Sequence, residues 1–484
     1  MKTDRDLRQL LREIDHKSYP AYKSLAGAWA FRDYTLVIDH VQGDPFASPS
    51  QLHVEIPVRK AGFPTVYLSS EAGRLALEDY LIRKVYASFN KISGKAQGSG
   101  KSGLIAITKS GQEVLKRSAC EFRADQLILR FFVGFPAFGR SVNSKDLEKI
   151  FFEDLPSCIS EALFYKNADK KAVEDAVYLS EDQMALRKEM KKRNLVAFVA
   201  NGSVLPRKSG VSELPMKDAV LFQSPGSLSV TITLPHKGEI NGMGIPAGVT
   251  LIVGGGYHGK STLLEAIQNG VYNHIRGDGR EYVLTDDTAV KVRAEDGRSI
   301  RNVDISLFIN NLPSNKDTKC FSSEDASGST SQAAAVIEAM EAGASVLLMD
   351  EDTSATNFMV RDDFMKQVIS PDKEPITPFV DRVRALWEEA GISTILVAGS
   401  SGAFFSASDH VLMLDAYQVY DISDRVKRLC KKKGIKACEA ERISLPDENR
   451  KLPAFHKKEE KRKNYRGTAV ETVRRDHMKI LLHV

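Results

Sequence analysis

The feature that most constrains this chain is a glycine-rich stretch at residues 250–270, TLIVGGGYHGKSTLLEAIQNG. A β-branched apolar run leads directly into the glycines, and a run of helix formers follows them and closes at Gly270. Strand, glycine loop and helix are the context that a phosphate loop of the form G-x-x-x-x-G-K-[ST] requires. Both flanks argue against a chance match in a glycine-rich turn. The pattern is met by Gly254, Gly259, Lys260 and Ser261.

Such a loop cradles a phosphate chain because its glycines let backbone N–H groups converge on one point. The N-terminus of the following helix adds partial positive charge. We expect Lys260 to reach the β- and γ-phosphates and the Ser261 hydroxyl to bind Mg²⁺. The residues predicted to contact the nucleotide are Gly254, Gly255, Gly256, Tyr257, His258, Gly259, Lys260, Ser261 and Thr262.

A second half of the site is predicted at residues 344–358, ASVLLMDEDTSATNF. The apolar run Val346–Met349 indicates a buried strand, and Asp350 follows it, placed to bind Mg²⁺ through water. Glu351 comes next and is the candidate catalytic residue that orients or deprotonates the attacking water. The alternative is an ordinary boundary between a strand and a turn. Two acids at the end of a buried strand are costly unless a cation meets them, which favours the site.

These motifs resemble the ATP-binding-cassette (ABC) class of ATPases, in which a signature of the LSGGQ type precedes the Asp-Glu strand at a fixed distance. Here that distance from Asp350 falls on a Ser-Gly-Ser-Thr sequence followed by helix formers. The signature residues, implied to act on the nucleotide of a second subunit, are Ser327, Gly328, Ser329 and Thr330.

The chain departs from the class at two motifs. The switch histidine is absent from residues 393–402, STILVAGSSG, where Gly399, Ser400 or Ser401 takes its place. The Q-loop glutamine is absent from residues 304–313, DISLFINNLP, and the nearest stand-ins are Asn310 and Asn311. The missing histidine predicts slow hydrolysis, whereas Glu351 predicts that hydrolysis is retained.

Most of the chain is similar to the family of soluble predicted ATPases of the ABC class, of which residues 38–50, IDHVQGDPFASPS, look like a further hallmark. The resemblance implies an α/β fold: a P-loop NTPase with an ABC-type cassette, an α+β N-terminal domain and a basic C-terminal region. The implied domains are residues 1–234, 235–424 and 425–484. It also implies ATP and Mg²⁺ as ligands and a homodimer with two composite sites.

Composition agrees with a globular protein of two or three domains. The chain has 484 residues, of which 42% are apolar and 27% charged, with a net charge of +5. No apolar run reaches the roughly 18 residues that span a bilayer. The charged N-terminus has no signal-peptide core, and the five cysteines form no CxxC pair, so we expect a cytoplasmic protein.

The N-terminal half predicts a mixed α and β domain. Expected helices cover residues 4–14, 71–89, 153–165 and 180–194, and strands begin at residues 34, 127 and 195. Residues 94–103, GKAQGSGKSG, contain Gly-Lys-Ser, but Lys95 stands where the phosphate-loop spacing needs glycine. A mobile surface loop is expected there. The alternative is a basic loop that contacts phosphate backbones.

Two other basic segments leave alternatives open. Residues 280–309 predict strands with a turn at Asp296–Gly297, forming either a solvated hairpin or a basic flap; the clustered arginines are Arg293, Arg298 and Arg301. Beyond Asp424 the chain is rich in lysine and arginine, as expected for RNA or DNA binding. Residues expected to stack on bases there are Phe455, His456 and Tyr465. The alternative is a solvated charged face, and residues 472–484 predict an amphipathic helix.

Three functions fit these patterns. The first is a dimeric ABC-class ATPase that couples closure on ATP to handling a macromolecule, with RNA or DNA as the candidates. The second is a small-molecule kinase built on the phosphate loop, which would need a lid over its acceptor. The third is a nucleotide-gated binding module with little turnover.

Overall fold

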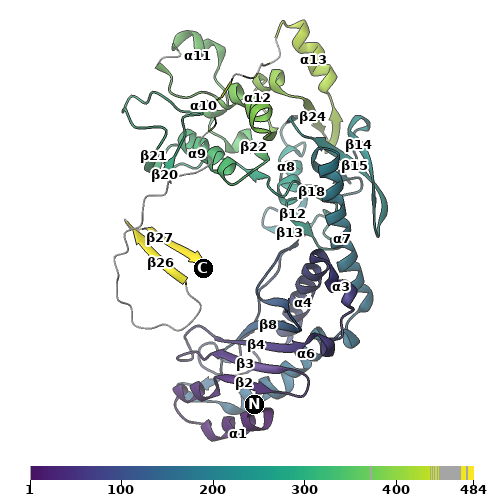
Figure 1. Ribbon diagram of the computed structural model, residues 1–484, viewed down its shortest axis with the longest axis vertical. Coiled ribbons are helices and arrows are strands. Elements are labelled where there is room, and N and C mark those ends of the chain that lie inside the picture. Colours follow the sequence, from purple (N-terminus) through teal and green to yellow (C-terminus); the bar gives the residue numbers. More distant parts are fainter. Residues whose placement is uncertain are drawn as a thin grey trace. The chain divides into compact units, whose positions relative to one another are not determined.

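The computed structural model describes residues 2–96, 98–370 and 373–435, a few positions up to 445, and the backbone of residues 470–475 and 478–483. The chain divides into two compact units, residues 1–445 and 446–484. Figure 1 shows the elements of both units along the chain. The two units are described separately below.

The N-terminal part of the first unit is built on a seven-stranded sheet in the order β1-β2-β3-β4-β8-β5, with β7 also paired to β8. Its strands are β1 (Lys2–Thr3), β2 (Gly27–Ala30), β3 (Thr35–His40), β4 (Ser50–Pro57), β5 (Ile105–Ala106), β7 (Cys120–Arg123) and β8 (Gln126–Val133). Side chains of β4 alternate between buried and partly exposed, the pattern of a sheet with one face on the core. The predicted strands at residues 34 and 127 are therefore confirmed.

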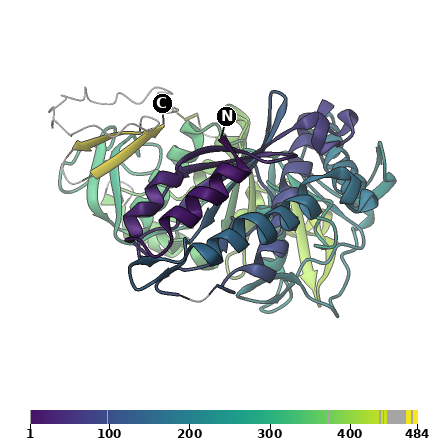
Figure 2. The same cartoon turned by 90° about the horizontal axis from the view of Figure 1, so that it is seen from below.

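Helices bury the inner face of this sheet (Figures 1 and 2). They are α1 (Asp4–Ile14), α4 (Glu71–Ile92) and α6 (Leu155–Leu163), which confirm three of the predicted helices, with α2 (Val58–Ala61), α3 (Thr65–Ser69) and α5 (Ser144–Lys149) between them. A reciprocal capping box between Thr3 and Asp6 starts α1. Leu7, Leu11 and Ile14 then enter a core with Leu77 and Leu81 of α4.

Helix α7 (Lys170–Lys192) packs against α4 on one side and against β11, β14 and β18 on the other. The predicted helix at residues 180–194 is its second half. The Arg187 side chain on α7 donates hydrogen bonds to the carbonyl oxygens of Gly270, Val271 and Thr285. This guanidinium therefore satisfies backbone groups where the helix after the phosphate loop ends.

Two sheets follow α7. The antiparallel sheet has the order β14-β15-β11-β18, with β11 (Leu195–Ala200), β14 (Ser229–Leu234), β15 (Gly238–Pro246) and β18 (Val283–Thr285). The six-stranded sheet has the order β19-β22-β23-β16-β24-β25, with β16 (Val249–Val253), β19 (Val290–Lys291), β22 (Val346–Asp350), β23 (Ser393–Val397), β24 (His410–Asp415) and β25 (Gln418–Asp421). Its central strands are parallel and largely apolar because both faces are covered.

The covering helices are α8 (Lys260–Asn269), α9 (Gly328–Glu341), α12 (Phe379–Ala390) and α13 (Ser423–Lys432). Helices α9 and α12 pack in one core cluster through Val336, Ile337 and Val383. Leu263, Leu264 and Ile267 of α8 enter another with β16 and β22. The carboxyl ends of β16, β22 and β23 therefore meet at one edge, which is where the candidate site lies.

No hairpin forms around Asp296–Gly297 in this described part of the chain, contrary to the prediction. Strand β19 pairs in parallel with β22, and β20 (Arg298–Val303) pairs with β21 (Phe321–Ala326). The predicted turn exists, with φ of 80° at Gly297, but it connects two different sheets. Nor is the segment a free basic flap, because its arginines contact carboxylates in the pairs Arg293–Glu295, Arg298–Glu338 and Arg301–Glu324.

The predicted C-terminal helix is also wrong. Strand β26 (Val470–Arg475) pairs antiparallel with β27 (Met478–His483). The β-branched residues Val470, Thr472, Val473 and Ile480 have a high strand propensity, which outweighs the helical period of residues 472–484. The stacking candidates Phe455, His456 and Tyr465 lie outside the described residues.

Candidate nucleotide site

The phosphate loop joins β16 to α8 in the predicted order, and two glycines in it are required by close packing. Gly254 has φ of 145°, and a Cβ there would lie 2.4 Å from the Leu414 carbonyl oxygen. Gly259 has φ of 95°, and a Cβ there would lie 2.9 Å from the Tyr417 ring. Any side chain at either position would strain the loop or displace β24 and its turn.

The Lys260 ammonium lies inside the curve of the loop. Its Nζ donates to the carbonyl oxygens of Gly254, at 2.8 Å, and Gly255, at 2.7 Å. These contacts hold the ammonium at the helix N-terminus, where an anion would also gather. Lys260 therefore lies at the first position of α8 with its charge directed into the loop, and its contact with the β- and γ-phosphates stays a prediction.

Tyr257 and His258 form the outer part of the loop. Tyr257 is fully exposed and has φ of 64°, a left-handed conformation uncommon for an aromatic residue. The His258 Nδ1 accepts a hydrogen bond from the Ala416 N–H at 2.9 Å and lies 3.0 Å from Asp415 Oδ1. The Ala416 bond requires an unprotonated Nδ1, so in that state the Asp415 contact is not an ion pair. His258 thus fastens the loop to the β24–β25 turn.

Ser261 and Asp350 meet at the edge of the sheet, as predicted. The Ser261 hydroxyl donates to Asp350 Oδ2 at 3.3 Å, and Asp350 is buried at 4% exposure. Among the described residues no three His, Cys, Asp or Glu side chains gather as a metal cage. A hydroxyl and one carboxylate beside a phosphate loop nevertheless fit Mg²⁺, which usually takes one or two protein ligands together with substrate phosphates.

Glu351 follows Asp350 and is held by the loop after β23. Its Oε2 accepts hydrogen bonds from the N–H groups of Gly399, at 2.6 Å, and Ser400, at 3.0 Å, while the Ser400 hydroxyl donates to Oε1. Partial burial raises the pKa of Glu351, but these donors outweigh it and hold the pKa below its ordinary value. Glu351 is therefore an ionised acceptor at neutral pH. Ser400 contacts it from the position of the missing switch histidine.

The signature segment begins α9, with Ser327 as the exposed N-cap residue. The Ser327 and Thr330 hydroxyls lie 3.0 Å apart. The buried Ser329 hydroxyl donates to Asn357 Oδ1 at 2.6 Å, so it is already partnered within the chain. Within the described residues no hydrogen bond joins residues 327–330 to the phosphate loop of the same chain.

Gln332 is a positioning residue that the sequence analysis missed. Its side chain is fully buried; Nε2 donates to the Ser354 hydroxyl at 2.9 Å, and Oε1 accepts from the Ala355 N–H at 2.9 Å. Ser354 in turn donates to the Asp350 carbonyl at 2.8 Å. The signature helix is therefore tied to the segment after Glu351. A glutamine two residues beyond the Ser-Gly-Ser-Thr sequence was the available signal.

The proposed Q-loop stand-ins make no described hydrogen bond to the phosphate loop. Asn310 donates through Nδ2 to the Ser306 carbonyl at 2.5 Å, and its N–H donates to the Pro375 carbonyl. Asn311 has φ of 52°, a left-handed conformation that asparagine adopts more readily than most residues. None of these contacts reaches the phosphate loop, so the stand-in role of Asn310 and Asn311 stays a prediction.

A cavity of about 430 Å³ adjoins the phosphate loop and was not foreseen. Gly259 and Thr262 form its wall on the loop side, and the Tyr417 ring lies at the same end. The opposite wall comes from residues 205–222, including Met216 and Phe222. Tyr417 is 55% exposed and has φ of 67°. The cavity thus presents an aromatic ring beside the phosphate loop, and its lining combines apolar side chains with the charged residues Arg207, Asp218 and Glu265.

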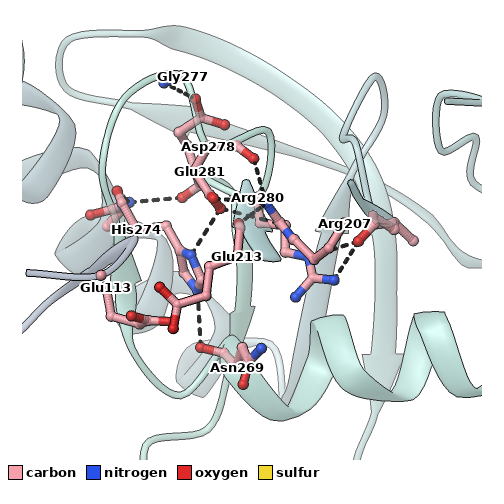
Figure 3. Close-up of polar contacts among 12 residues, drawn as sticks. Glu113, Arg207, Glu213, Asn269, His274, Gly277, Asp278, Arg280 and Glu281 are labelled. Carbon is pink, nitrogen blue, oxygen red and sulfur yellow. Dashed lines mark hydrogen bonds and ion pairs between the residues drawn. The ribbon is translucent and has the colours of Figure 1, made fainter. Parts of the chain in front are cut away.

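A buried polar cluster supports α8 from behind (Figure 3). Asp278 is fully buried, with Oδ1 2.8 Å from Arg207 Nη1 and Oδ2 2.9 Å from His274 Nδ1. The opposite ring nitrogen of His274 lies 3.1 Å from the carbonyl oxygen of Asn269, the last residue of α8. Arg280 is also buried and donates through Nε to the Leu205 carbonyl at 2.9 Å. The cluster connects the end of α8 to residues 205–207.

Replacing Asp278 by asparagine should destabilise the protein, because it leaves Arg207 and His274 buried without their carboxylate. Breaking such a pair costs about 3–5 kcal/mol. Burial raises the Asp278 pKa, but His274, Arg207 and Arg280 outweigh it and lower it. The carboxylate's contribution is therefore present above its unfolded pKa of about 3.9 and is lost as pH falls through the folded pKa. Urea unfolding at pH 7 and below pH 4 checks both points.

Asp218 offers a matched control, because it is exposed and has no ion-pair partner among the described residues. Its asparagine variant should unfold like the wild type. If Asp278→Asn is as stable as the wild type at pH 7, the cluster does not hold the end of α8.

Comparisons with known proteins identify the class. Residues 169–449 match the P-loop domain of the ABC_ATPase family, and residues 4–166 match the N-terminal domain of ATPases of the ABC class. The chain belongs to this family of ABC-class ATPases. The predicted family, the α/β P-loop fold and the N-terminal domain are thereby confirmed, and nucleotide binding follows. The boundaries at 234 and 424 stay predictions, as does the basic C-terminal region.

The relative and the solved structures that this chain resembles are distant from it in sequence. An uncharacterised protein of Methanocaldococcus jannaschii is 29% identical over 249 residues, which are 49% of this chain and 54% of that protein. The chain thus matches about half the length of this relative. The solved structures of cbiO1 from Clostridium perfringens, part of an ABC transporter complex, and of the ABC-transporter cassette MJ1267 are 15% and 14% identical, with TM-scores of 0.30 and 0.27. They cover 50% and 40% of this chain, and 95% and 89% of their own.

None of the described helices is both long and apolar enough to cross a bilayer.

Proposed function

We propose that this protein binds ATP with Mg²⁺ at the phosphate loop and hydrolyses it, in a cytoplasmic homodimer whose closure handles a macromolecule. The observation that carries the proposal is the meeting of three elements at one sheet edge. Ser261 contacts Asp350, and the adjacent Glu351 is fixed as an ionised acceptor by Ser400. These are the parts that phosphoryl transfer to water requires: a phosphate cradle, a metal position and a group that orients the water.

Residues 254–262 would bind the phosphates, with Lys260 on the β- and γ-oxygens. Ser261 and Asp350 would hold Mg²⁺, which would neutralise charge on the phosphates. Glu351 would accept a hydrogen bond from the attacking water and take its proton. The cavity between Tyr417 and Met216 would take the nucleoside, with the base stacked on the tyrosine ring. Phosphate release measured with ATP and Mg²⁺ tests the whole assignment.

The signature supports a homodimer with composite sites. Ser327 is exposed at the start of α9, where its hydroxyl and the helix N-terminus can meet the γ-phosphate held by a second copy. Ser329 is buried and donates to Asn357, so the Ser327 and Thr330 hydroxyls and the backbone are the groups left for that contact.

Replacing Ser327 by arginine should leave ATP binding intact and abolish pairing driven by ATP, because a bulky side chain would stand between signature and nucleotide. Light scattering after size-exclusion chromatography, with and without ATP and Mg²⁺, measures the mass. The control is Ser24→Arg, at an exposed serine of the N-terminal part. A Ser327→Arg dimer with ATP would contradict the composite sites. Wild type that stays monomeric while ATP binds would favour the small-molecule kinase instead.

Nucleic acid is the macromolecule that a described element favours. Helix α13 and the residue after it carry six exposed cations that have no ion-pair partner among the described residues: Arg425, Lys427, Arg428, Lys431, Lys432 and Lys433. Such a run can neutralise phosphates and release their counterions. Binding of an RNA or DNA oligonucleotide that weakens steeply with salt would support this part of the proposal.

A further inference from the structure

Three glycine-rich loops of the N-terminal part meet on one surface, which we call the loop platform. They are residues 43–49, 98–103 and 134–140. The second belongs to the GKAQGSGKSG stretch, which was expected to be mobile. Instead, it is held between the other two loops by backbone hydrogen bonds.

The bonds that join the loops fix their relative position. The Lys101 N–H donates to the Pro45 carbonyl at 2.8 Å, and the Ser99 N–H donates to the Ala137 carbonyl at 2.8 Å. The buried Gln42 side chain adds a third connection, because its amide donates to the Asp44 carbonyl and accepts from the Phe135 N–H.

Glycine is required where the loops touch. A Cβ at Gly100, where φ is 62°, would lie 2.2 Å from the Pro45 carbonyl oxygen. A Cβ at Gly134 would lie 1.8 Å from the Lys101 carbonyl oxygen. The glycines therefore serve close backbone packing, and the platform is a fixed scaffold.

The platform exposes two aromatic side chains. Phe46 is 67% exposed and Phe138 is 59% exposed, although neighbouring aromatic residues such as Phe135 are fully buried. Phe46 follows Pro45 and Phe138 follows Ala137, so both are anchored on residues 99–101. Two residues span at most about 7 Å, so the two loops that carry these rings attach to the same short segment. Large apolar side chains held in water on a fixed backbone mark an interaction surface.

Basic residues lie in or beside the same loops in the sequence. None of four basic residues in or beside the loops has an ion-pair partner among the described residues: Lys17, Lys95, Lys101 and Arg140. The Lys17 carbonyl accepts a hydrogen bond from the Val142 N–H, and the Arg140 carbonyl accepts one from the Tyr19 N–H. These bonds fix the backbone of both residues beside the platform. Asp44 keeps its negative charge, because its Oδ1 accepts only from the neutral N–H groups of Phe46 and Ala47. The three loops therefore carry two cations, Lys101 and Arg140, against this one carboxylate, and Lys17 and Lys95 flank them.

We infer that the loop platform binds single-stranded nucleic acid, with bases stacked on Phe46 and Phe138 and phosphates held by the surrounding cations. Fixed aromatic rings among basic side chains are the combination that single strands use, since every base offers a π-face and every linkage a negative charge. A duplex does not fit, because its bases are already stacked. The inference extends the nucleic-acid part of the proposed function to a second surface, and it is independent of the ATP site.

The test is binding of fluorescein-labelled 12-mers of oligouridylate and oligodeoxythymidylate to the full chain by anisotropy, without ATP, over a range of salt. Phe46→Ala/Phe138→Ala should weaken binding about 10-fold or more, because two bases would no longer stack on a ring. Lys95→Ala/Lys101→Ala should make the slope of log K against log salt shallower by about 1.4, that is about 0.7 for each phosphate that is no longer neutralised. The two oligomers separate RNA from DNA as the partner.

Controls separate the platform from other surfaces and from misfolding. Tyr420→Ala removes an aromatic residue that is 48% exposed on β25 and should bind like the wild type. Circular dichroism and thermal unfolding check that each variant folds. If the phenylalanine variants bind like the wild type while charge reversal on α13 abolishes binding, α13 is the binding surface. That outcome overturns the inference about the loop platform and leaves the nucleic-acid part of the proposed function standing. Wild type that binds neither oligomer overturns the platform together with the nucleic-acid part of the function. Binding to phosphatidylserine vesicles in place of oligomers overturns it in favour of a membrane.

Discussion

Replacing Glu351 by glutamine is expected to lower the rate of phosphate release from ATP by about 10²–10⁴-fold, the range that a positioned general base supplies. The amide has nearly the same shape but cannot take a proton from water. It also offers one acceptor oxygen where the carboxylate offers two; with that oxygen on the Gly399 and Ser400 N–H groups, the amide nitrogen faces the Ser400 hydroxyl and the direction of that hydrogen bond reverses. ATP affinity should be retained, because Glu351 is not expected to contact the phosphates.

The matched control for this variant is Asp352→Asn, which makes the same change of charge one residue further on at an exposed side chain. It should hydrolyse ATP at nearly the wild-type rate. Equal rates for wild type and Glu351→Gln would mean that Glu351 is not the base, and the nucleotide-gated binding module would then be the better description.

Because Ser400 donates hydrogen bonds to Glu351, we also expect a specific pH dependence of the rate of phosphate release. Donors from the loop after β23 hold the Glu351 pKa below its ordinary value. A base that must be ionised keeps working as pH falls until the pH reaches its own pKa. The acidic limb of the rate should therefore lie below the ordinary glutamate pKa of about 4.3. Ser400→Ala removes one donor and should move that limb toward higher pH, which a purely structural role would not do.

The central site was largely predictable because its signals are local. The glycine spacing of residues 254–259 encodes a turn that only glycine can make at Gly254 and Gly259, and the apolar runs on either side fix β16 and α8 within a residue or two. The strand ending at Asp350 was equally clear, since a parallel strand covered on both faces is apolar throughout.

The sequence alone did not indicate which segments, far apart along the chain, are in contact in the fold. Ser400 is 49 residues from Glu351, and Gln332 is 23 residues from Ala355, yet each pair is joined by a hydrogen bond. The cavity beside the phosphate loop has the same origin, because residues 205–222 and Tyr417 are distant in sequence. Periodicity describes one segment at a time and says nothing about its partner.

The wrong predictions share that cause. The turn at Asp296–Gly297 was correctly recognised, but its two flanks pair with β22 and β21 and not with each other. The GKAQGSGKSG stretch has the composition of a flexible linker, yet its glycines pack against the carbonyls of Pro45 and Ala137. Glycine content alone does not distinguish freedom from close packing.

Replacing Lys260 by alanine is expected to weaken ATP binding about 100-fold. Hydrogen bonds to charged groups contribute about 1.5–3 kcal/mol, and the ammonium is proposed to contact two phosphates. The effect on folding should be small, because Lys260 lies at the first position of α8 and its side-chain hydrogen bonds go to the carbonyls of Gly254 and Gly255 within the loop. Titration with a fluorescent ATP analogue measures the affinity, and thermal unfolding checks the fold.

The comparison of ATP with AMP decides whether the loss comes from the phosphates. AMP lacks the β- and γ-phosphates, so its affinity should change little in Lys260→Ala while that of ATP falls. Lys217→Ala, at an exposed lysine in the segment that forms the opposite wall of the cavity, should affect neither ligand. An equal loss for ATP and AMP would mean that the variant has distorted the loop. An unchanged affinity for ATP would mean that the glycine loop does not hold the triphosphate, and the roles proposed for Ser261, Asp350 and Glu351 would then lose their common anchor.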